Sequence, residues 1–98
     1  MSQSERSIMN YIRHALGNHL AIPILWYISH HENATYEQIR GYIIYVTNTD
    51  LKQALSELMT YHVLQCEQGG YTFTKDGQAL VPVLDEIFQW AETTTEKS

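Results

Sequence analysis

Apolar residues recur at steps of three and four along the first part of the chain, which is the spacing of one face of a helix. The residues that carry this pattern are Ile8, Ile12, Ala15 and Leu16. The segment 2–5 has the Ser-x-x-Glu pattern, in which the hydroxyl and the carboxylate each accept a hydrogen bond from a free backbone amide. Gly17 can take the left-handed conformation that ends a helix. The pattern predicts a helix from Gln3 to Leu16.

The segment from Asn18 to His31 is apolar nearly all round, with an uninterrupted apolar run from Leu20 to Ile28. This run is too short to cross a bilayer, which needs about 20 residues. It predicts a central helix that is buried on more than one side. Pro23 lacks an amide donor, so either the helix begins close to Pro23 or its first turn is kinked.

Two further cap patterns each predict a short helix. Thr35 precedes Gln38 at capping-box spacing, and Thr47 precedes Asp50 in the same way. The connection 44–46 between the two helices has the length expected of a helix-turn-helix. The apolar faces are Tyr36, Ile39 and Ile43 in the first helix and Leu51, Leu55, Leu58 and His62 in the second.

After residue 62 the apolar period changes from that of a helix to that of a strand. Leu64 and Cys66 share one face, and Tyr71 and Phe73 alternate with threonines after the glycine pair 69–70. This pattern predicts a two-stranded hairpin with a tight turn at the glycines.

Thr74 is expected to cap a last helix that runs to about Ala91 and is bent at Pro82. Its apolar residues form a band too wide for one amphipathic face, so one side can cover the core while the other meets a partner. The band consists of Leu80, Val81, Val83, Leu84, Ile87, Phe88 and Trp90. The polar segment 93–98 is expected to be a disordered tail.

The composition supports a single domain over residues 1–98, mainly α-helical with one small β-hairpin. Of the 98 residues 44% are apolar, which is enough for one modest hydrophobic core. Cys66 is the only cysteine, so no intramolecular disulfide can form and a reducing compartment, the cytoplasm, is expected. The segment 1–6 is polar and does not have the pattern of a secretory signal, and no membrane association is expected.

The sequence offers no catalytic constellation. Serine, histidine and aspartate occur as scattered single residues, without a nucleophile beside a base or a phosphate-binding glycine loop. His30 and His31, with Glu32 nearby and His62 further on, invite a metal hypothesis. Adjacent histidines at a helix end do not share a face, however, and the helix dipole accounts for them there. His62 is expected to be a packed residue or one that caps the end of its helix. We therefore expect no enzyme activity, no metal and no cofactor.

Cys66 and several tyrosines have competing interpretations. Cys66 is expected to pack inward beside Leu64 as a small apolar group, because no cationic neighbour in the sequence would activate its thiol for a redox role. Four tyrosines could line a ligand pocket, form a surface for a partner or join the core, and core packing is the better account. They are Tyr42, Tyr45, Tyr61 and Tyr71.

The order of the predicted elements is that of a winged helix-turn-helix, and particular segments resemble the HxlR-type family of bacterial transcriptional regulators. The segments are LKQALSEL (51–58), VL (63–64), YTFTKDG (71–77) and, within the closest stretch 80–92, LDEIFQWAE (84–92). They are similar to the family's leucine-rich recognition helix, its aromatic-x-Leu-Thr-x-x-Gly turn and its C-terminal Pro-Val-Leu-Asp helix. The resemblance extends over nearly the whole chain.

The resemblance implies a dimeric DNA-binding regulator that acts on a pseudo-palindromic site. Family members pair through their first and last helices, which implies an interface of Ile8, Tyr11, Ile12, Val83, Ile87, Phe88 and Trp90. On the face of the recognition helix opposite its leucines, the side chains can bind base edges or phosphates. The residues expected on the DNA side are Asn48, Thr49, Lys52, Gln53 and Ser56, with Arg40 and Lys75. An ordinary solvated helix face is the alternative for these positions.

Three features depart from the family pattern. The frequent N-terminal Cys-Pro is absent, so redox sensing through it is not implied. The wing is reduced to 68–70 without Lys or Arg, and the recognition helix carries Lys52 against Asp50 and Glu57. The net charge of −5, from 11 acidic and 6 basic residues, has the wrong sign overall for nucleic-acid binding, although a local basic patch can exist. A winged helix that serves as a protein-interaction module is therefore the alternative function.

Overall fold

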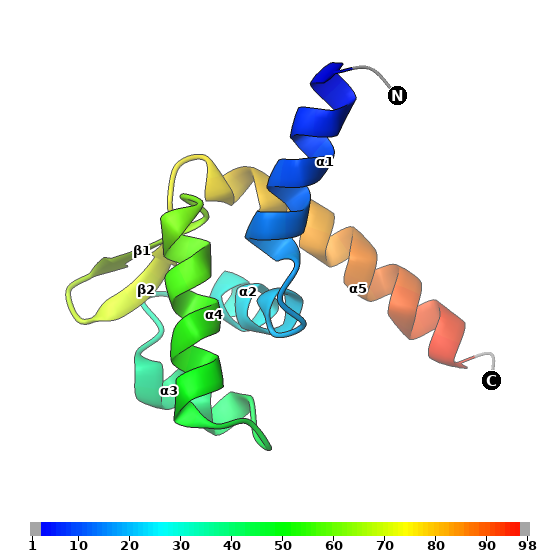
Figure 1. Cartoon of the computed structure of the whole chain (residues 1–98). Helices are drawn as coiled ribbons and strands as arrows, with labels where there is room; N and C mark the ends of the chain where they lie inside the picture. The colour runs from blue at the N-terminus through cyan, green and yellow to red at the C-terminus, as the bar shows by residue number, and fades with distance from the viewer. Residues whose placement is uncertain (1–2, 97–98) are drawn as a thin grey trace.

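Residues 3–96, the part of the chain that the computed structural model describes, form helices and one hairpin in the predicted order (Figure 1). Helices α1 and α5 extend from a body made of the other helices and the hairpin. This arrangement confirms the predicted winged helix-turn-helix. None of the helices in this range combines the length and the apolar character that crossing a bilayer requires. The elements are α1 (Gln3–Leu16), α2 (Ala21–His30), α3 (Tyr36–Tyr42), α4 (Asn48–Thr60), β1 (Leu64–Glu67), β2 (Gly70–Phe73), the 3₁₀ helix η1 (Gly77–Leu80) and α5 (Val81–Glu96).

The first helix has the predicted bounds, but it ends differently from the prediction. The proposed cap at Ser2 lies outside the described residues. Gly17 does not have the left-handed φ that was expected; among the described glycines only Gly69 does. A Cβ atom on Gly17 would overlap the carbonyl oxygen of Arg13, so a glycine is needed here for close approach of the chain to α1.

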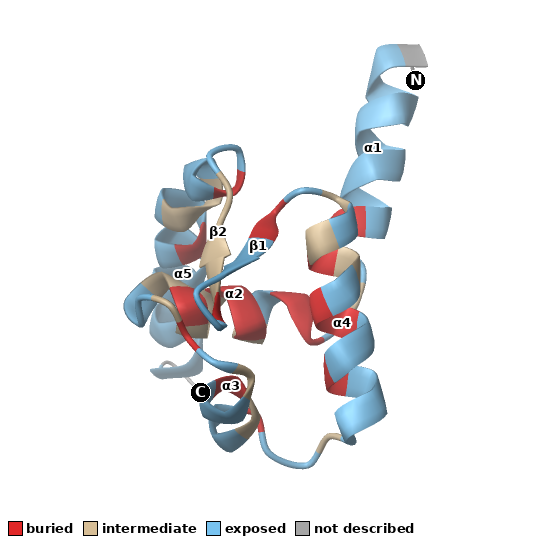
Figure 2. Cartoon of the chain, turned by 90° about the vertical axis from the view of Figure 1, so that its left-hand side faces the viewer, coloured by how far each residue is buried: buried red, intermediate tan, exposed pale blue. Residues whose placement is uncertain are grey.

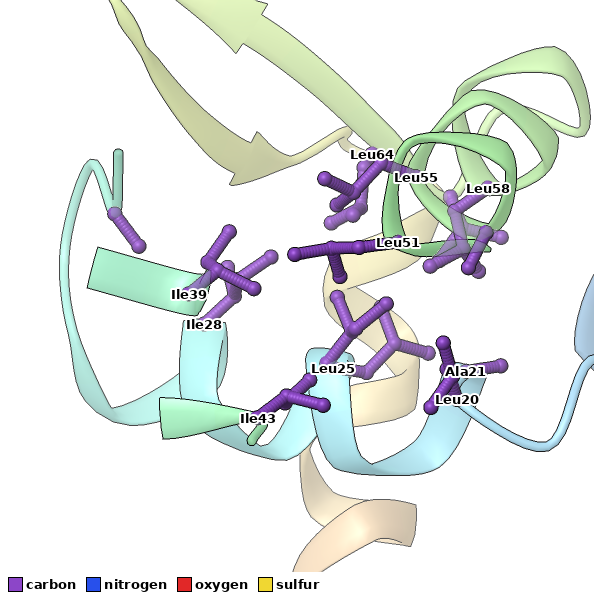
Figure 3. Packing of buried hydrophobic residues seen from close by; sticks show 14 of the residues in the cluster. Leu20, Ala21, Leu25, Ile28, Ile39, Ile43, Leu51, Leu55, Leu58 and Leu64 are labelled. Carbon is purple, nitrogen blue, oxygen red and sulfur yellow. The ribbon is translucent and has the colours of Figure 1, made fainter. Parts of the chain in front are cut away.

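The contact between α4 and α2 lies at the centre of the core (Figure 3). Leu51, Leu55 and Leu58 form a leucine stripe on one face of α4 and are fully buried, as their spacing predicts. Ile39 of α3 lies beside this contact. No polar or charged side chain of residues 3–96 is buried, so apolar packing alone holds the core. The stripe packs against Ala21, Ile24, Leu25 and Ile28 of α2.

Side-chain caps fix where α3 and α4 begin. Thr35 and Gln38 form the predicted capping box: the Gln38 amide donates to Thr35 Oγ1 at 3.2 Å, and the Thr35 amide donates to Gln38 Oε1 at 3.0 Å. Thr47 Oγ1 accepts a hydrogen bond from the Asp50 amide at 3.1 Å. Both predicted helix starts are confirmed.

A Schellman arrangement ends α4 and directs the chain into the hairpin. His62 has a left-handed φ of 62°. Its amide donates to the Met59 carbonyl at 3.1 Å, and the Val63 amide donates to the Leu58 carbonyl at 2.9 Å. The assignment of His62 to the apolar face of α4 is therefore wrong, because the helix ends at Thr60 and His62 is exposed.

The central helix α2 resolves the two alternatives for Pro23. It begins two residues before Pro23, so the proline lies in the first turn, where a helix does not need its amide. At the other end, Nδ1 of His30 lies 3.0 Å from the Trp26 carbonyl oxygen and Nδ1 of His31 lies 2.9 Å from that of Tyr27. Both histidines thus contact the last carbonyls of the helix, where the dipole favours them.

The hairpin turn is displaced by one residue from the prediction. Glu67 pairs with Gly70, so the two-residue turn is Gln68-Gly69 and not the glycine pair. Gln68 and Gly69 have φ values of 52° and 80°, as in a type I′ turn. Gly70 lies within β2 against the carbonyl of Asn33, where a Cβ atom has no room.

The hairpin is joined to the body through β2. The Tyr71 amide donates to the Ala34 carbonyl at 2.7 Å. Burial, with Cys66 and Tyr36 nearby, raises the pKa of the Tyr71 hydroxyl above its ordinary value of 10.0. Cys66 was expected to pack inward beside Leu64 but is exposed, because Leu64 alone of β1 is buried and the strand then leaves the core.

The C-terminal helix differs from the prediction at both ends. Thr74 acts as a cap, since its Oγ1 accepts a hydrogen bond from the Gly77 amide at 2.9 Å, but the turn that it caps is 3₁₀. Helix α5 begins one residue before Pro82, so the expected bend is replaced by a change from 3₁₀ to α-helix at this point. Helix α5 continues to Glu96 and so includes the first four residues of the segment 93–98 that was expected to be a tail; the two residues beyond it lie outside the described range.

We expect Leu55→Ala to lower the free energy of unfolding by about 2–5 kcal/mol, because it opens a cavity where α4 meets α2. Leu55 is only 1% exposed. Urea unfolding followed by circular dichroism measures the change. Ser56→Ala, on the exposed face of the same helix, should change it by less than about 0.5 kcal/mol. Equal stabilities of the two variants would contradict this packing.

Candidate nucleic-acid interface

The outward face of α4 is polar and open to solvent. In Figure 2 the buried positions of α4 lie on the side of α2, and the exposed ones lie away from it. Four exposed side chains recur at steps of three and four, so they share one face of the helix. They are Thr49, Lys52, Gln53 and Ser56; Asn48, Asp50 and Thr60 of α4 are also exposed. The structure therefore brings together four of the residues expected to face DNA.

Asn48, the first residue of α4, joins α4 to α3. Its Oδ1 accepts hydrogen bonds from the Tyr36 hydroxyl at 2.7 Å and from Arg40 Nε at 2.9 Å. These bonds hold the guanidinium of Arg40 beside the start of α4. The side-chain carbonyl oxygen of Asn48 thus accepts hydrogen bonds from within the protein, which leaves the two N–H groups of its side-chain amide to donate to an acceptor on another molecule.

Lys52 completes a cluster at the corner between α3 and α4. Its Nζ lies 5.7 Å from the centroid of the Tyr36 ring, within reach of a cation–π attraction. Tyr36, Arg40, Asn48 and Lys52 are together named the corner cluster. The next residue, Gln53, donates from Nε2 to Glu57 Oε1 at 3.2 Å. The corner cluster places two cations beside the first turn of α4.

Lys75 lies far from the corner cluster. It follows Thr74, whose hydroxyl donates to the carbonyl of His62, just beyond the end of α4. The two ends of this helix are about 18 Å apart at about 1.5 Å per residue. Lys75 and the corner cluster therefore lie at opposite ends of α4, a separation that spacing along the sequence does not reveal.

The hairpin presents no positive charge. The segment 64–73 contains Glu67 and no Lys or Arg, and residues 65–69 are exposed. A phosphate beside this hairpin would meet a carboxylate and neutral groups. The wing thus differs from the basic edge that would strengthen DNA binding.

All seven residues expected at a dimer interface are exposed in the single chain. Trp90 is 69% exposed. Phe88 stacks on Trp26 of α2 with ring centroids 4.0 Å apart, and the Tyr11 hydroxyl donates to the Tyr61 carbonyl at 2.6 Å. The seven residues are Ile8, Tyr11 and Ile12 on α1 and Val83, Ile87, Phe88 and Trp90 on α5.

Further apolar surface lies beside these residues. Met9 is also exposed on α1 and does not belong to the predicted set, although it lies three residues before Ile12 and seven before Leu16, at the spacing of one helix face. A groove of about 450 Å³ lies between α1 and η1, and Ile12, Leu16 and Leu80 contribute to its walls. The two terminal helices thus expose more apolar surface than the seven predicted residues provide.

The four tyrosines divide into two groups. Tyr61 and Tyr71 pack against the core, as predicted. Tyr42 and Tyr45 do not, so core packing is wrong for them: Tyr42 is half exposed with its ring 4.7 Å from that of Tyr27, and Tyr45 is 96% exposed. The loop between α3 and α4 turns Tyr45 away from the core, and its φ is 68°.

Metal ligation finds no support among the described residues. Within 3–96 no group of three or more His, Cys, Asp or Glu side chains could hold a metal ion. His30 and His31 lie against the rings of Trp26 and Tyr27, with centroids 4.1 Å and 4.0 Å apart. These contacts give both histidines a place in the packing around α2.

The helix-turn-helix corner and the hairpin that follows it define a winged helix-turn-helix protein. Residues 15–98 match the HxlR-like helix-turn-helix family. The match covers most of the chain, and the chain belongs to this family, as the resemblance predicted. No curated protein and no solved structure shows a significant match. The family is one of DNA-binding regulators and is not typically enzymatic, which indicates a DNA-binding transcriptional regulator.

Asn48→Ala should lower the free energy of unfolding by about 1 kcal/mol, because it removes the shared acceptor of the Tyr36 hydroxyl and Arg40 Nε. Asn48→Asp keeps an acceptor and adds a negative charge beside Arg40 and the N-terminus of α4, so it should be at least as stable as the parent. Urea unfolding compares the variants. An alanine variant as stable as the parent would show that these bonds do not hold α3 to α4.

Proposed function

We propose that this protein regulates transcription as a homodimer that binds double-stranded DNA with one α4 helix in each of two major grooves. The grooves are successive ones on a pseudo-palindromic site, about one helical turn or about 34 Å apart. The observation that carries the proposal is the exposed polar face of α4, oriented by its buried leucine stripe, in a chain of the HxlR-like family. A cytoplasmic location is part of the proposal and accords with the single cysteine.

The side chains of α4 have distinct roles in this proposal. The Gln53 amide pairs with an adenine edge, and Lys52 pairs with guanine or a phosphate. Thr49 and Ser56 donate from their hydroxyls to phosphate oxygens. Arg40, held by Asn48, neutralises a phosphate at the start of the helix. Lys75 lies too far from this end of α4 to share their contacts, and it supplies at most a separate phosphate contact.

Electrostatics limit the affinity. The net charge is −5, and the corner cluster supplies two cations per chain, Arg40 and Lys52. A dimer therefore neutralises about four phosphates there, which contributes about 4 to the magnitude of the slope of log K against log salt; a phosphate contact of Lys75 on each chain would raise the magnitude to about 5. Groups without charge must supply much of the remaining binding.

The apolar surfaces of α1 and α5 support a dimer. Two helices with so many exposed apolar side chains carry more apolar surface than soluble monomers usually leave uncovered. A second copy related by a two-fold axis would cover the same surfaces on both chains. Dimerisation also doubles the number of α4 helices presented to one duplex, which compensates for the few cations of each chain.

The double variant Lys52→Ala, Gln53→Ala should weaken duplex binding at least about tenfold at low salt, because it removes the contact of Gln53 with a base and the contact of Lys52 with a base or a phosphate. The salt slope should fall by about 2 for the dimer. Fluorescence anisotropy with genomic DNA fragments at two salt concentrations measures both. Arg6→Ala removes the same charge from α1 and should bind like the parent. No duplex binding by the parent at low salt would refute the proposal.

Trp90→Ala should shift the protein toward monomer, because this side chain is the most exposed of the predicted interface. Multi-angle light scattering across a range of concentrations gives the mass. Gln89→Ala, a neutral exposed neighbour on α5, should remain a dimer at the same concentrations. A parent protein with the mass of one chain would rule out the interface.

A protein-interaction module without DNA binding is the second candidate function. It is favoured by the acidic net charge and by the absence of Lys and Arg from the hairpin segment 64–73. The two candidates differ in one readout. A regulator binds duplex DNA at low salt, whereas the module remains a dimer and binds no duplex at any salt concentration.

A further inference from the structure

Tyr45, in the loop between α3 and α4, has an exposure and a backbone conformation that the fold does not explain. At 96% it is more exposed than any other large apolar side chain in residues 3–96. Within that range it has no hydrogen-bond or aromatic partner. Its φ of 68° lies in the left-handed region, which bulky side chains rarely adopt.

The corner needs the left-handed conformation but does not need a tyrosine. Three other residues that are not glycine have a left-handed φ, and for each of them the local structure explains this conformation. Asn33 is of a type that tolerates the conformation, His62 ends α4, and Gln68 lies in the type I′ turn. Glycine or asparagine would serve the corner at Tyr45 with less strain. Exposure and strain together disfavour tyrosine here in the isolated chain, so they point to a contact outside it.

The surroundings of Tyr45 indicate what that contact is. It lies three residues before Asn48 and on the same corner as the cations Arg40 and Lys52. Figures 1 and 2 both show this loop at the N-terminal end of α4, and Figure 1 shows it away from α1 and α5. The loop therefore lies beside the proposed DNA surface and apart from the proposed dimer surface.

We propose that Tyr45 is a DNA-backbone contact, with its ring against a deoxyribose and its hydroxyl donating to a phosphate oxygen at the edge of the groove that α4 enters. Tyrosine hydroxyls are among the neutral groups that bind phosphates and fix the register of a protein on a duplex. The contact adds affinity without charge, which suits a surface with two cations per chain. This inference rests on the proposed DNA binding and adds a positioning residue to it.

The test compares three variants by fluorescence anisotropy on a labelled random-sequence duplex pool of about 30 base pairs, long enough for two half-sites. Tyr45→Asn should raise Kd about tenfold or more, because each protomer loses a hydrogen bond to a charged group. The salt slope should stay at the parent value, because no charge is removed. Tyr45→Phe should fall between the parent and Tyr45→Asn.

His62→Asn is the matched control, since His62 is another exposed left-handed residue but lies beyond the opposite end of α4. Both asparagine variants should melt at or above the parent temperature, because strain is relieved. Only Tyr45→Asn should lose DNA affinity. A loss of affinity together with higher stability separates a contact residue from one that supports the fold.

Three results would overturn the inference. Tyr45→Asn binding like the parent would remove Tyr45 from the interface while leaving the proposed function intact. A lower mass of Tyr45→Asn in light scattering would assign the residue to a protein contact instead. No duplex binding by the parent would refute the proposed function, and the role of Tyr45 would fall with it.

Discussion

The packing of the leucine stripe of α4 against α2 is the constraint on which the other features of this protein depend. Leu51, Leu55 and Leu58 are almost completely buried, and apolar contact alone holds them. Because a helix turns by about 100° per residue, burying these positions exposes Lys52 and Ser56 on the opposite face. The same period that builds the core thus selects the side chains that face outward. The cap at the start of α4 and the Schellman arrangement at its end then fix its length and direct the chain into the hairpin.

The two ends of α4 have different chemistry. At its start lies the corner cluster, which contains two cations and the hydrogen bonds between α3 and α4. At its end the chain passes into a hairpin that contains a carboxylate and no Lys or Arg. A surface so poor in positive charge gains little from counterion release. Neutral donors such as Thr49, Ser56 and Tyr45 therefore carry more of the proposed interaction than they would in a basic protein, and dimerisation multiplies their effect.

Much of the fold could be predicted because its signals are local. The caps at Thr35 and Thr47 and the period of the leucine stripe depend on residues within a few positions of one another. The failures involve positions whose surroundings come from distant segments. Cys66 alternates correctly with Leu64, yet the strand leaves the core between them. For the site, the face of α4 followed from its period, whereas the distance of Lys75 and the bonds of Asn48 to α3 depend on how the elements meet.

The most direct test of the central claim is a titration of isotope-labelled protein with duplex DNA, followed by NMR through the backbone amides. If the exposed face of α4 binds DNA, shift changes will concentrate in residues 45–56 and be small in β1 and in the outer half of α5. Changes confined to α1 and α5, or no changes at low salt, would contradict the account.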